Sequence, residues 1–424
     1  MPKEEFINYI WQYQQFTKTN LLTTDGQALT VLNVGFYNQD AGPDFSNARL
    51  VIAGIEWAGN VEIHSKASDW FLHHHEINDA YENVVLHVVW EADKPVFRKD
   101  GTLIPTIALK DKVAKDLILK YNYLIDNQLI IPCQEQFGGI EHFYKIRALD
   151  AAMLERLGQK SRIVYEKWEA NNRDWEQTTF ELLARNFGFK INAEPFEQLA
   201  KNLPLKVLQK HRDNRLSVEA MVFGVAGLLQ SNSDVYASQL KQEYDFYKAK
   251  FELADKQMNA HEWKFLRLRP ANFPTIRLAQ FAALMHAQQS LFSLFTETKS
   301  YKKIIENLKV KQNSYWQKNY DFGKESARET VGLGKASIEN IIINTVVPLL
   351  FTYGQYIDNQ ELKDRAIAFL EEIKAEENHI TAHWEGLGLP IKTAFDSQAS
   401  IELFNNFCSK KQCLRCAIGR VILK

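Results

Sequence analysis

The stretch from Gly59 to His75, GNVEIHSKASDWFLHHH, concentrates residues that could do chemistry. Within it, VEIHSK alternates apolar and polar residues, which is typical of a β-strand with one polar face. Glu62, His64 and Lys66 then point to the same face, roughly 6–7 Å apart along the strand. A carboxylate, an imidazole and an amine on one face can bind a cation, orient a water molecule and accept its proton.

A second carboxylate comes from GPDF, which places Asp44 at the start of the preceding strand. If the two strands pair, Asp44 and Glu62 form a hard oxygen site suited to Mg²⁺ or Mn²⁺, with the carbonyl of Ile63 as a third ligand. Such a metal polarises a phosphoryl oxygen and lowers the pKa of a bound water. We predict that Asp44 and Glu62 hold the metal and that His64 or Lys66 acts on the water. The alternative is a turn aspartate followed by a solvated sheet face.

A short helix is expected after this strand, with Ser68 as its N-cap and its end near Asn78. Asp69 and His73 are four residues apart and share one helix face, so we predict that they support the site. Consecutive helix residues are turned by about 100°, so at most one or two of the three adjacent histidines can face the strand. The alternative for the others is a solvated surface.

His87 lies in the β-branched run ENVVLHVVWEA (82–92). It fits either a supporting role at the site or a hydrogen-bonded place in the core. A further arrangement is a histidine-rich hydrolase, in which His64, His73 or His75, and His87 bind Zn²⁺.

The elements that position these residues can be predicted from periodicity. Apolar residues at helical spacing indicate a first helix over residues 4–16. Extended patterns indicate strands over residues 28–36, 47–54, 55–66 and 82–92, the second and third being joined as a hairpin at Gly54, and PVFRKDGTLIPTIAL is expected to close the region as another hairpin. The order αβββαβ predicts an α+β domain with a mixed sheet over residues 1–130.

From about Lys112 the 3.6-residue pattern dominates and strand-like runs almost vanish. We therefore predict a mostly α-helical domain over residues 131–424. Prolines mark several of its helix boundaries, and no solenoid repeat is evident.

The αβββαβ order, with GPDF entering the second strand and VEIHSK in the third, resembles the core of the PD-(D/E)xK nuclease superfamily over roughly residues 1–110. This resemblance implies metal-dependent hydrolysis of a phosphodiester in DNA or RNA. The chain departs from the superfamily at the expected lysine, where it has His64. That departure leaves open a non-catalytic module that binds nucleic acid or protein on the same core.

The chain resembles more closely, over most of its length, an uncharacterised bacterial family of full-length proteins with the same two-part layout. The marks of this resemblance are GPDFSNARL, WAGNVEIHSKASDW, AYENVVLHVVW and the terminal CLRCAIG. It implies an intracellular bacterial protein without an assigned reaction.

Three of the four cysteines lie near the end of the chain, with the spacing C-x4-C-x2-C at Cys408, Cys413 and Cys416. Two thiolates separated by two residues can bind one metal, and Cys133 could complete a set of four around Zn²⁺ or an iron–sulfur cluster. Some nucleases with the PD-(D/E)xK core hold such a cluster by one distant and three neighbouring cysteines, although their spacing differs. The alternative is that the cysteines are small buried residues that pack a C-terminal helix.

A proline-rich connection in the helical part, LRLRPANFPTIRL, carries Arg267, Arg269 and Arg277. Three guanidinium groups there could form an anion-binding loop, or they could belong to an ordinary connection between helices.

Composition sets the remaining limits. The 424 residues carry 51 Lys and Arg against 52 Asp and Glu, so any basic groove for a nucleic-acid partner must be local. Neither a secretory leader nor an apolar run of about 18 residues is evident, which predicts a cytoplasmic protein outside the membrane. Phosphate-loop, dinucleotide-binding and serine-elbow motifs do not occur, and nothing specifies the oligomeric state.

Overall fold

The alternating run around Glu62 forms a central strand, as its pattern predicts. The computed structural model describes residues 1–229 and 234–424. In it, β4 (Ile55–Lys66) lies between the antiparallel β3 (Phe45–Ile52) and the parallel β5 (Val84–Glu91). The chain reverses between β3 and β4 at Ala53 and Gly54, which both have positive φ, so the predicted hairpin is present.

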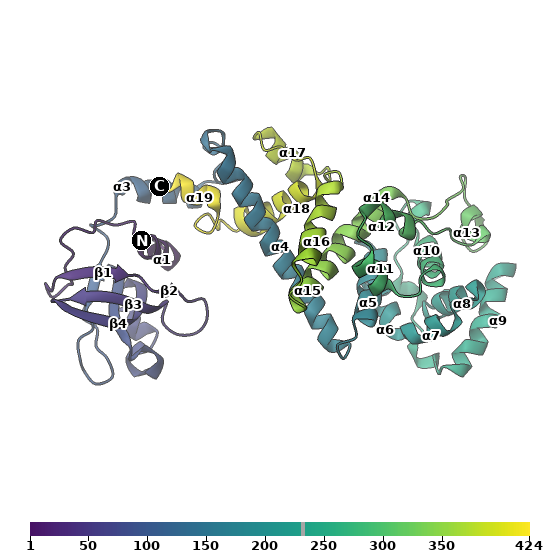
Figure 1. Ribbon diagram of the computed structural model, residues 1–424, viewed down its shortest axis with the longest axis horizontal. Coiled ribbons are helices and arrows are strands. Elements are labelled where there is room, and N and C mark those ends of the chain that lie inside the picture. The colour runs from purple at the N-terminus through teal and green to yellow at the C-terminus, as the bar shows by residue number, and fades with distance from the viewer. Residues whose placement is uncertain (230–233) are drawn as a thin grey trace. The chain divides into compact units, whose positions relative to one another are not determined.

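The sheet continues on both sides of these three strands, in the order β1-β3-β4-β5-β6. Figure 1 labels β1, β3 and β4 of this sheet. β1 (Leu29–Asn33) is antiparallel to β3, and β6 (Thr106–Ala108) is parallel to β5. The strand expected over residues 28–36 is interrupted, and β2 (Phe36–Tyr37) pairs separately with β3. Helix α1 (Glu4–Gln12) packs against β4. The predicted α+β class with a mixed sheet is confirmed.

The helix predicted from Ser68 to about Asn78 is wrong in its length. α2 (Asp69–Leu72) is a single turn, and two 3₁₀ turns follow at His75–Ile77 and Asp79–Tyr81. The break occurs at His74, whose φ of 58° is left-handed and cannot continue a right-handed helix. Trp70 and Tyr81, on either side of this break, are buried in one cluster beneath β5 residues, and their burial offsets the cost of the left-handed residue.

By their internal packing, the residues form two compact units, 1–148 with 403–424, and 149–402. The first unit also contains α3 (Lys115–Asp126) and α19 (Ala417–Ile422), and α4 (His142–Ala170) runs across the division. The other elements, all in the second unit, are α5 (Trp175–Phe187), α6 (Ala193–Asn202), α7 (Leu205–His211), α8 (Arg215–Val225), α9 (Val235–Lys250), α10 (Pro274–Ala287), α11 (Leu291–Glu297), α12 (Tyr301–Leu308), α13 (Ser314–Lys318), β7 (Asn319–Asp321), β8 (Lys324–Glu325), α14 (Lys335–Ile341), α15 (Val347–Tyr356), α16 (Gln360–Glu372), α17 (His379–Gly386) and α18 (Ala394–Glu402).

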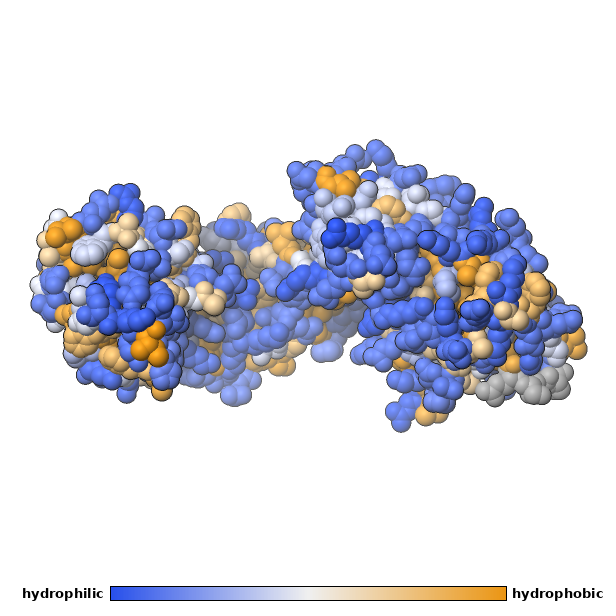
Figure 2. Space-filling model, turned by 90° about the horizontal axis from the view of Figure 1, so that it is seen from below, coloured by the Kyte–Doolittle hydropathy of each residue, from blue (hydrophilic) through white to orange (hydrophobic). Residues whose placement is uncertain are grey.

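The second unit is almost wholly helical, as predicted for this part of the chain. The apolar segment Lys335–Tyr356 has the length and composition of a membrane-crossing helix. However, 56% of its most apolar stretch is buried inside the protein. Ile338, Ile342 and Leu350 are fully buried there, which is the behaviour of a core helix. The surface seen in Figure 2 is mainly hydrophilic, with scattered apolar patches.

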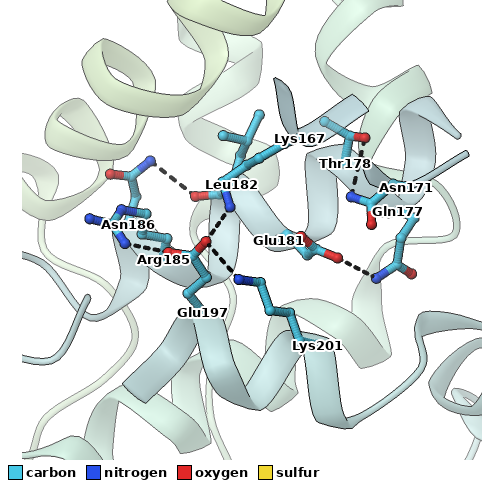
Figure 3. A network of polar contacts seen from close by, with 10 residues as sticks. All are labelled: Lys167, Asn171, Gln177, Thr178, Glu181, Leu182, Arg185, Asn186, Glu197 and Lys201. Carbon is cyan, nitrogen blue, oxygen red and sulfur yellow. Dashed lines mark hydrogen bonds and ion pairs between the residues drawn. The ribbon is translucent and has the colours of Figure 1, made fainter. Parts of the chain in front are cut away.

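A partly buried carboxylate ties three helices of this unit together (Figure 3). Glu197 on α6 accepts hydrogen bonds from Lys167 on α4 and Arg185 on α5, and Lys201 lies 3.4 Å away. Burial opposes the charge on Glu197, but the bonds from Lys167 and Arg185 outweigh it and lower the pKa of Glu197 to about 2. The charge of Glu197 is therefore already balanced by Lys167 and Arg185, and these residues form a structural network of ion pairs.

Candidate functional site

Asp44 and Glu62 meet at the start of β3, as the sequence predicts. The backbone N–H of Asp44 donates to Glu62 Oε2 at 3.1 Å, and the backbone N–H of Ile63 donates to Asp44 Oδ2 at 3.0 Å. The register that pairs Phe45 with Val61 places the two acids opposite each other. Each carboxylate is thus fixed by the other residue's strand, and neither is free to turn into solvent.

The two acids share a largely buried site. Burial, followed by the nearby Glu62 carboxylate, raises the pKa of Asp44 to about 7. Burial also raises the pKa of Glu62 to about 8, although the hydrogen bond from Asp44 opposes this. Across the part of the chain that the structure describes, no lysine or arginine forms an ion pair with either acid. Lys66 is exposed at the far end of β4. Burial there opposes the charge of Asp93, but hydrogen bonds from Ser68, with a smaller contribution from Lys66, lower the pKa of Asp93.

Helix α1 adds two polar residues to the site that sequence reasoning missed. The pKa of Glu4 is raised by burial, while His73 and the Ser65 backbone N–H act against this rise. The side chain of Asn8 hydrogen-bonds to Asp44 and lowers its pKa, and the buried Asn8 Oδ1 has no partner in the described chain. The signal was their i, i+4 spacing, which puts an acid and an amide on one face of the helix.

A chain of imidazoles runs from the sheet to the surface. His64 Nδ1 lies 2.8 Å from His87 Nε2, and His64 Nε2 lies 3.1 Å from His73 Nδ1. His64 and His87 are buried, whereas His73 is exposed. Burial, and then the neighbouring histidines, lower the pKa of His64 to about 2. His64 is therefore neutral, and both of its ring nitrogens already have partners.

His75 joins this group because the left-handed His74 turns the chain back toward the sheet. His75 Nε2 lies 3.3 Å from Glu62 Oε1, and the ring stacks on Tyr81 with 3.7 Å between centroids. Neither of its buried ring nitrogens makes a hydrogen bond with the described residues. The ligand atoms of His64, His73 and His75 lie within 4.8 Å of one another, close enough to bind one ion.

Asp69, which was predicted to support the site, closes the turn after β4. Its Oδ2 accepts a hydrogen bond from the Lys66 backbone N–H at 2.8 Å. It also raises the pKa of Glu4, so it lies near the edge of the site. Lys66 contributes its backbone here, while its amine forms no ion pair with either acid in the part of the chain that the structure describes.

The four cysteines line one small cavity in the first unit. Cys133, Cys408, Cys413 and Cys416 surround it together with Pro132, Phe407, Gln412 and Gly419. None of the four is in a disulfide, and three are buried. Burial and the neighbouring thiols raise the pKa of Cys133 to about 12, and burial with Cys416 raises that of Cys413 to about 12.

A family model described as "Protein of unknown function (DUF2851)" matches residues 4–379 of the chain. The match includes the sheet and the acids and histidines described above, while the terminal CLRCAIG lies outside the matched residues. No curated protein and no solved structure matches the chain. The resemblance of the first unit to PD-(D/E)xK nucleases stays a prediction.

Proposed function

Because the chain belongs to this family of unknown function (DUF2851), we propose a function from the chemistry of the site: metal-dependent hydrolysis of a phosphodiester in DNA or RNA. The observation that carries the proposal is the pair Asp44 and Glu62, held together and largely buried, with no lysine or arginine of the described residues in an ion pair with them. Ionising both of these buried carboxyl groups costs free energy unless a cation binds between them. A divalent ion fits this requirement, and carboxylate oxygens are the ligands that Mg²⁺ and Mn²⁺ prefer.

Asp44 and Glu62 would hold the ion, and His75, with its two unbonded ring nitrogens, is the nearest additional ligand. When bound, the ion polarises a phosphoryl oxygen and lowers the pKa of a water molecule. His64 is neutral and engaged on both sides, so it positions His73 rather than taking a proton itself. The exposed His73 is the better placed group to accept the proton. Glu4 borders the same space and would orient the water.

The proposed reaction also implies a substrate, a role for the helical unit and a cellular compartment. The substrate is a nucleic acid, and the helical unit would bind the substrate or a protein partner. Four free thiols fit a reducing compartment, so we place the protein in the cytoplasm.

One observation favours a second candidate, a zinc hydrolase. His64, His73 and His75 gather their ligand atoms within 4.8 Å, and imidazoles suit Zn²⁺ better than Mg²⁺. In this candidate the histidines hold the ion and Asp44 is dispensable. In the first candidate the acids hold the ion and His73 accepts a proton.

The proposal is tested by incubating the purified full chain with single- and double-stranded DNA and RNA in the presence of Mg²⁺, Mn²⁺ or Zn²⁺. We expect cleavage with Mg²⁺ or Mn²⁺ that EDTA abolishes and that Glu62→Ala reduces about a thousand-fold, since losing the ion removes several kcal/mol of transition-state stabilisation. The matched control is Glu56→Ala, an exposed glutamate of the same strand whose carboxylate binds Arg49. This variant should cleave like the wild type.

Equal cleavage by the wild type and Glu62→Ala would mean a contaminating nuclease and would contradict the proposal. Metal-dependent binding of nucleic acid without cleavage would also overturn it and would identify the protein as a binding module on a nuclease-like core.

A further inference from the structure

We propose that Cys133, Cys408, Cys413 and Cys416 form a tetrathiolate metal centre that fastens the C-terminal tail to the first unit. Cysteines far apart in the sequence line one cavity, and none of them forms a disulfide. Among the described residues no three of these sulfur atoms lie within 4.8 Å of one another, so the thiols must draw closer to hold a single ion. Four thiols around one space match the ligand set of a structural zinc ion or an iron–sulfur cluster. Both share the same chemistry, a soft cation or cluster held by thiolates, and the experiment below distinguishes them.

The backbone segments around the cavity pack tightly against each other. Cys416 is the N-cap residue of α19, so its thiol lies at the helix end where the backbone N–H groups of Ile418 and Gly419 favour a thiolate. A Cβ at Gly419 would lie 2.1 Å from the carbonyl oxygen of Cys413, so only glycine permits this approach. The loop and α19 are therefore packed to hold Cys413 and Cys416 together.

Basic residues of the tail supply further support. Four thiolates around a divalent ion carry a net negative charge, which needs compensation when it is buried. Lys411 lies close enough to Cys413, and Arg420 to Cys416, to favour their thiolate forms. Lys411 also donates hydrogen bonds to the carbonyl oxygens of Ile125 and Asn127, at the end of α3. The tail is thus attached to α3 near the same place (Figure 1).

The centre is tested by measuring zinc, iron and acid-labile sulfide in the purified full chain, before and after incubation with Zn²⁺ or with ferrous iron and sulfide. We expect close to one zinc ion per chain, or iron with sulfide and visible absorption, and a loss of at least about ten-fold in both Cys133→Ser and Cys413→Ser. Gln412→Ala, which lines the cavity without a thiol, should keep the wild-type metal content. Circular dichroism of each variant checks that it folds.

A wild-type chain that holds no metal as purified and takes up none from either solution would overturn the proposal. Unchanged metal content in the folded Cys133→Ser variant would also overturn it, because the centre requires this distant ligand.

Independently, we infer that a cavity in the second unit binds a small organic acid through Arg277. The cavity has a volume of about 390 Å³, within the usual range of small-molecule sites. Arg277 lines it and is 8% exposed. Burial lowers the pKa of Arg277 to about 10, and no carboxylate pairs with it in residues 1–229 or 234–424. A buried cation without a counter-ion is costly unless an anion joins it.

The guanidinium is held in place by neutral groups. Its nitrogens donate to Gln280 Oε1 at 3.0 Å, Asn272 Oδ1 at 2.6 Å and Ser337 Oγ at 3.2 Å, and it lies 4.3 Å above the ring of Phe189. Three of its five N–H groups are thus used, and two remain for a ligand. The guanidinium is oriented before any anion arrives, and its remaining N–H groups, on Nε and Nη1, can each donate a single hydrogen bond to a carboxylate or phosphate oxygen.

The rest of the lining indicates what the anion is attached to. Apolar side chains predominate next to Arg277, among them Phe196, Leu268 and Pro274. Lys190 adds a second positive charge at the exposed side. This combination fits an anionic group on an apolar body, such as an aromatic carboxylate or an aryl phosphate.

The cavity is tested by calorimetric titration of the full chain with benzoate, phenyl phosphate and the neutral control benzyl alcohol. We expect saturable binding of an anion but not of the alcohol, and a loss of at least about ten-fold in affinity in Arg277→Met. Arg269→Ala, an exposed arginine of the same connection, should bind as the wild type does. Asn340→Asp adds a negative charge at the exposed rim and should weaken binding without touching the buried network.

Equal binding of the alcohol would overturn this inference, as would undiminished anion binding in Asn340→Asp together with Arg277→Met. Binding of neither anion to the wild type would overturn it as well.

Discussion

Asp44→Asn is expected to abolish Mn²⁺ binding and to reduce phosphodiester cleavage about a thousand-fold, whereas His73→Ala should lose activity about a hundred-fold but keep its metal. Asparagine has the size of aspartate and can still accept the Ile63 N–H through its carbonyl oxygen, so the pairing of β3 and β4 is preserved. Only the charge is removed. Isothermal titration with Mn²⁺, beside initial rates of cleavage, separates the two effects.

The control for Asp44→Asn is Asp40→Asn, an exposed aspartate of the same loop, which should match the wild type in both measurements. The opposite pattern, in which His73→Ala loses bound Zn²⁺ and Asp44→Asn keeps it, would contradict the carboxylate site and favour the histidine-held zinc ion. The pair of variants therefore decides between the two candidate functions.

The sheet and the pair of acids could be predicted because both follow from local patterns. The extended pattern of IEWAGNVEIHSK predicts the strand Ile55–Lys66, and the glycine at residue 54 predicts the hairpin. Once β3 and β4 pair, geometry alone brings Asp44 opposite Glu62.

The remaining part of the site depends on tertiary packing, which no local pattern contains. Glu4 and Asn8 reach the acids only because α1 packs on β4 with that face inward. His75 enters the site because the helix stops at Leu72 and His74 becomes left-handed. A helical continuation was the natural prediction for this segment, since the stabilisation that interrupts it comes from Trp70 and Tyr81 in the core.

The charge relations also revise the expected roles within VEIHSK. Alternation correctly places Glu62 and His64 on one face, but that face is buried at these two residues and exposed toward both ends of the strand, at Glu56 and Lys66. His64 is consequently a neutral link between His87 and His73, and Lys66 lies beside Asp93. Periodicity predicts the face of the sheet to which each side chain points, whereas the burial of that side chain depends on which elements cover the strand.

Mg²⁺ is expected to raise the melting temperature of the wild-type chain by at least about 3 °C at pH 8.5 and by much less at pH 6. The folded pKa values of Asp44 and Glu62 are raised, to about 7 and about 8, above their unfolded values near 4. Their contribution to the free energy of unfolding is therefore fully present below about pH 4 and is lost as the pH rises toward 8. At pH 8.5 both acids are ionised and repel each other. A divalent ion bound between them offsets this repulsion, so its stabilising effect is largest at that pH.

Glu62→Gln removes one of the two charges. It should therefore reduce the change of melting temperature with pH and the change on adding Mg²⁺. Without Mg²⁺, its melting temperature should fall less between pH 6 and pH 8.5 than that of the wild type, and Mg²⁺ should add little at either pH. Glu56→Gln, with the same substitution on the exposed part of β4, should behave as the wild type in calorimetry. An equal Mg²⁺ effect at both pH values, or an undiminished one in Glu62→Gln, would show that the ion binds elsewhere, and the two buried acids would then have to be neutral parts of the core.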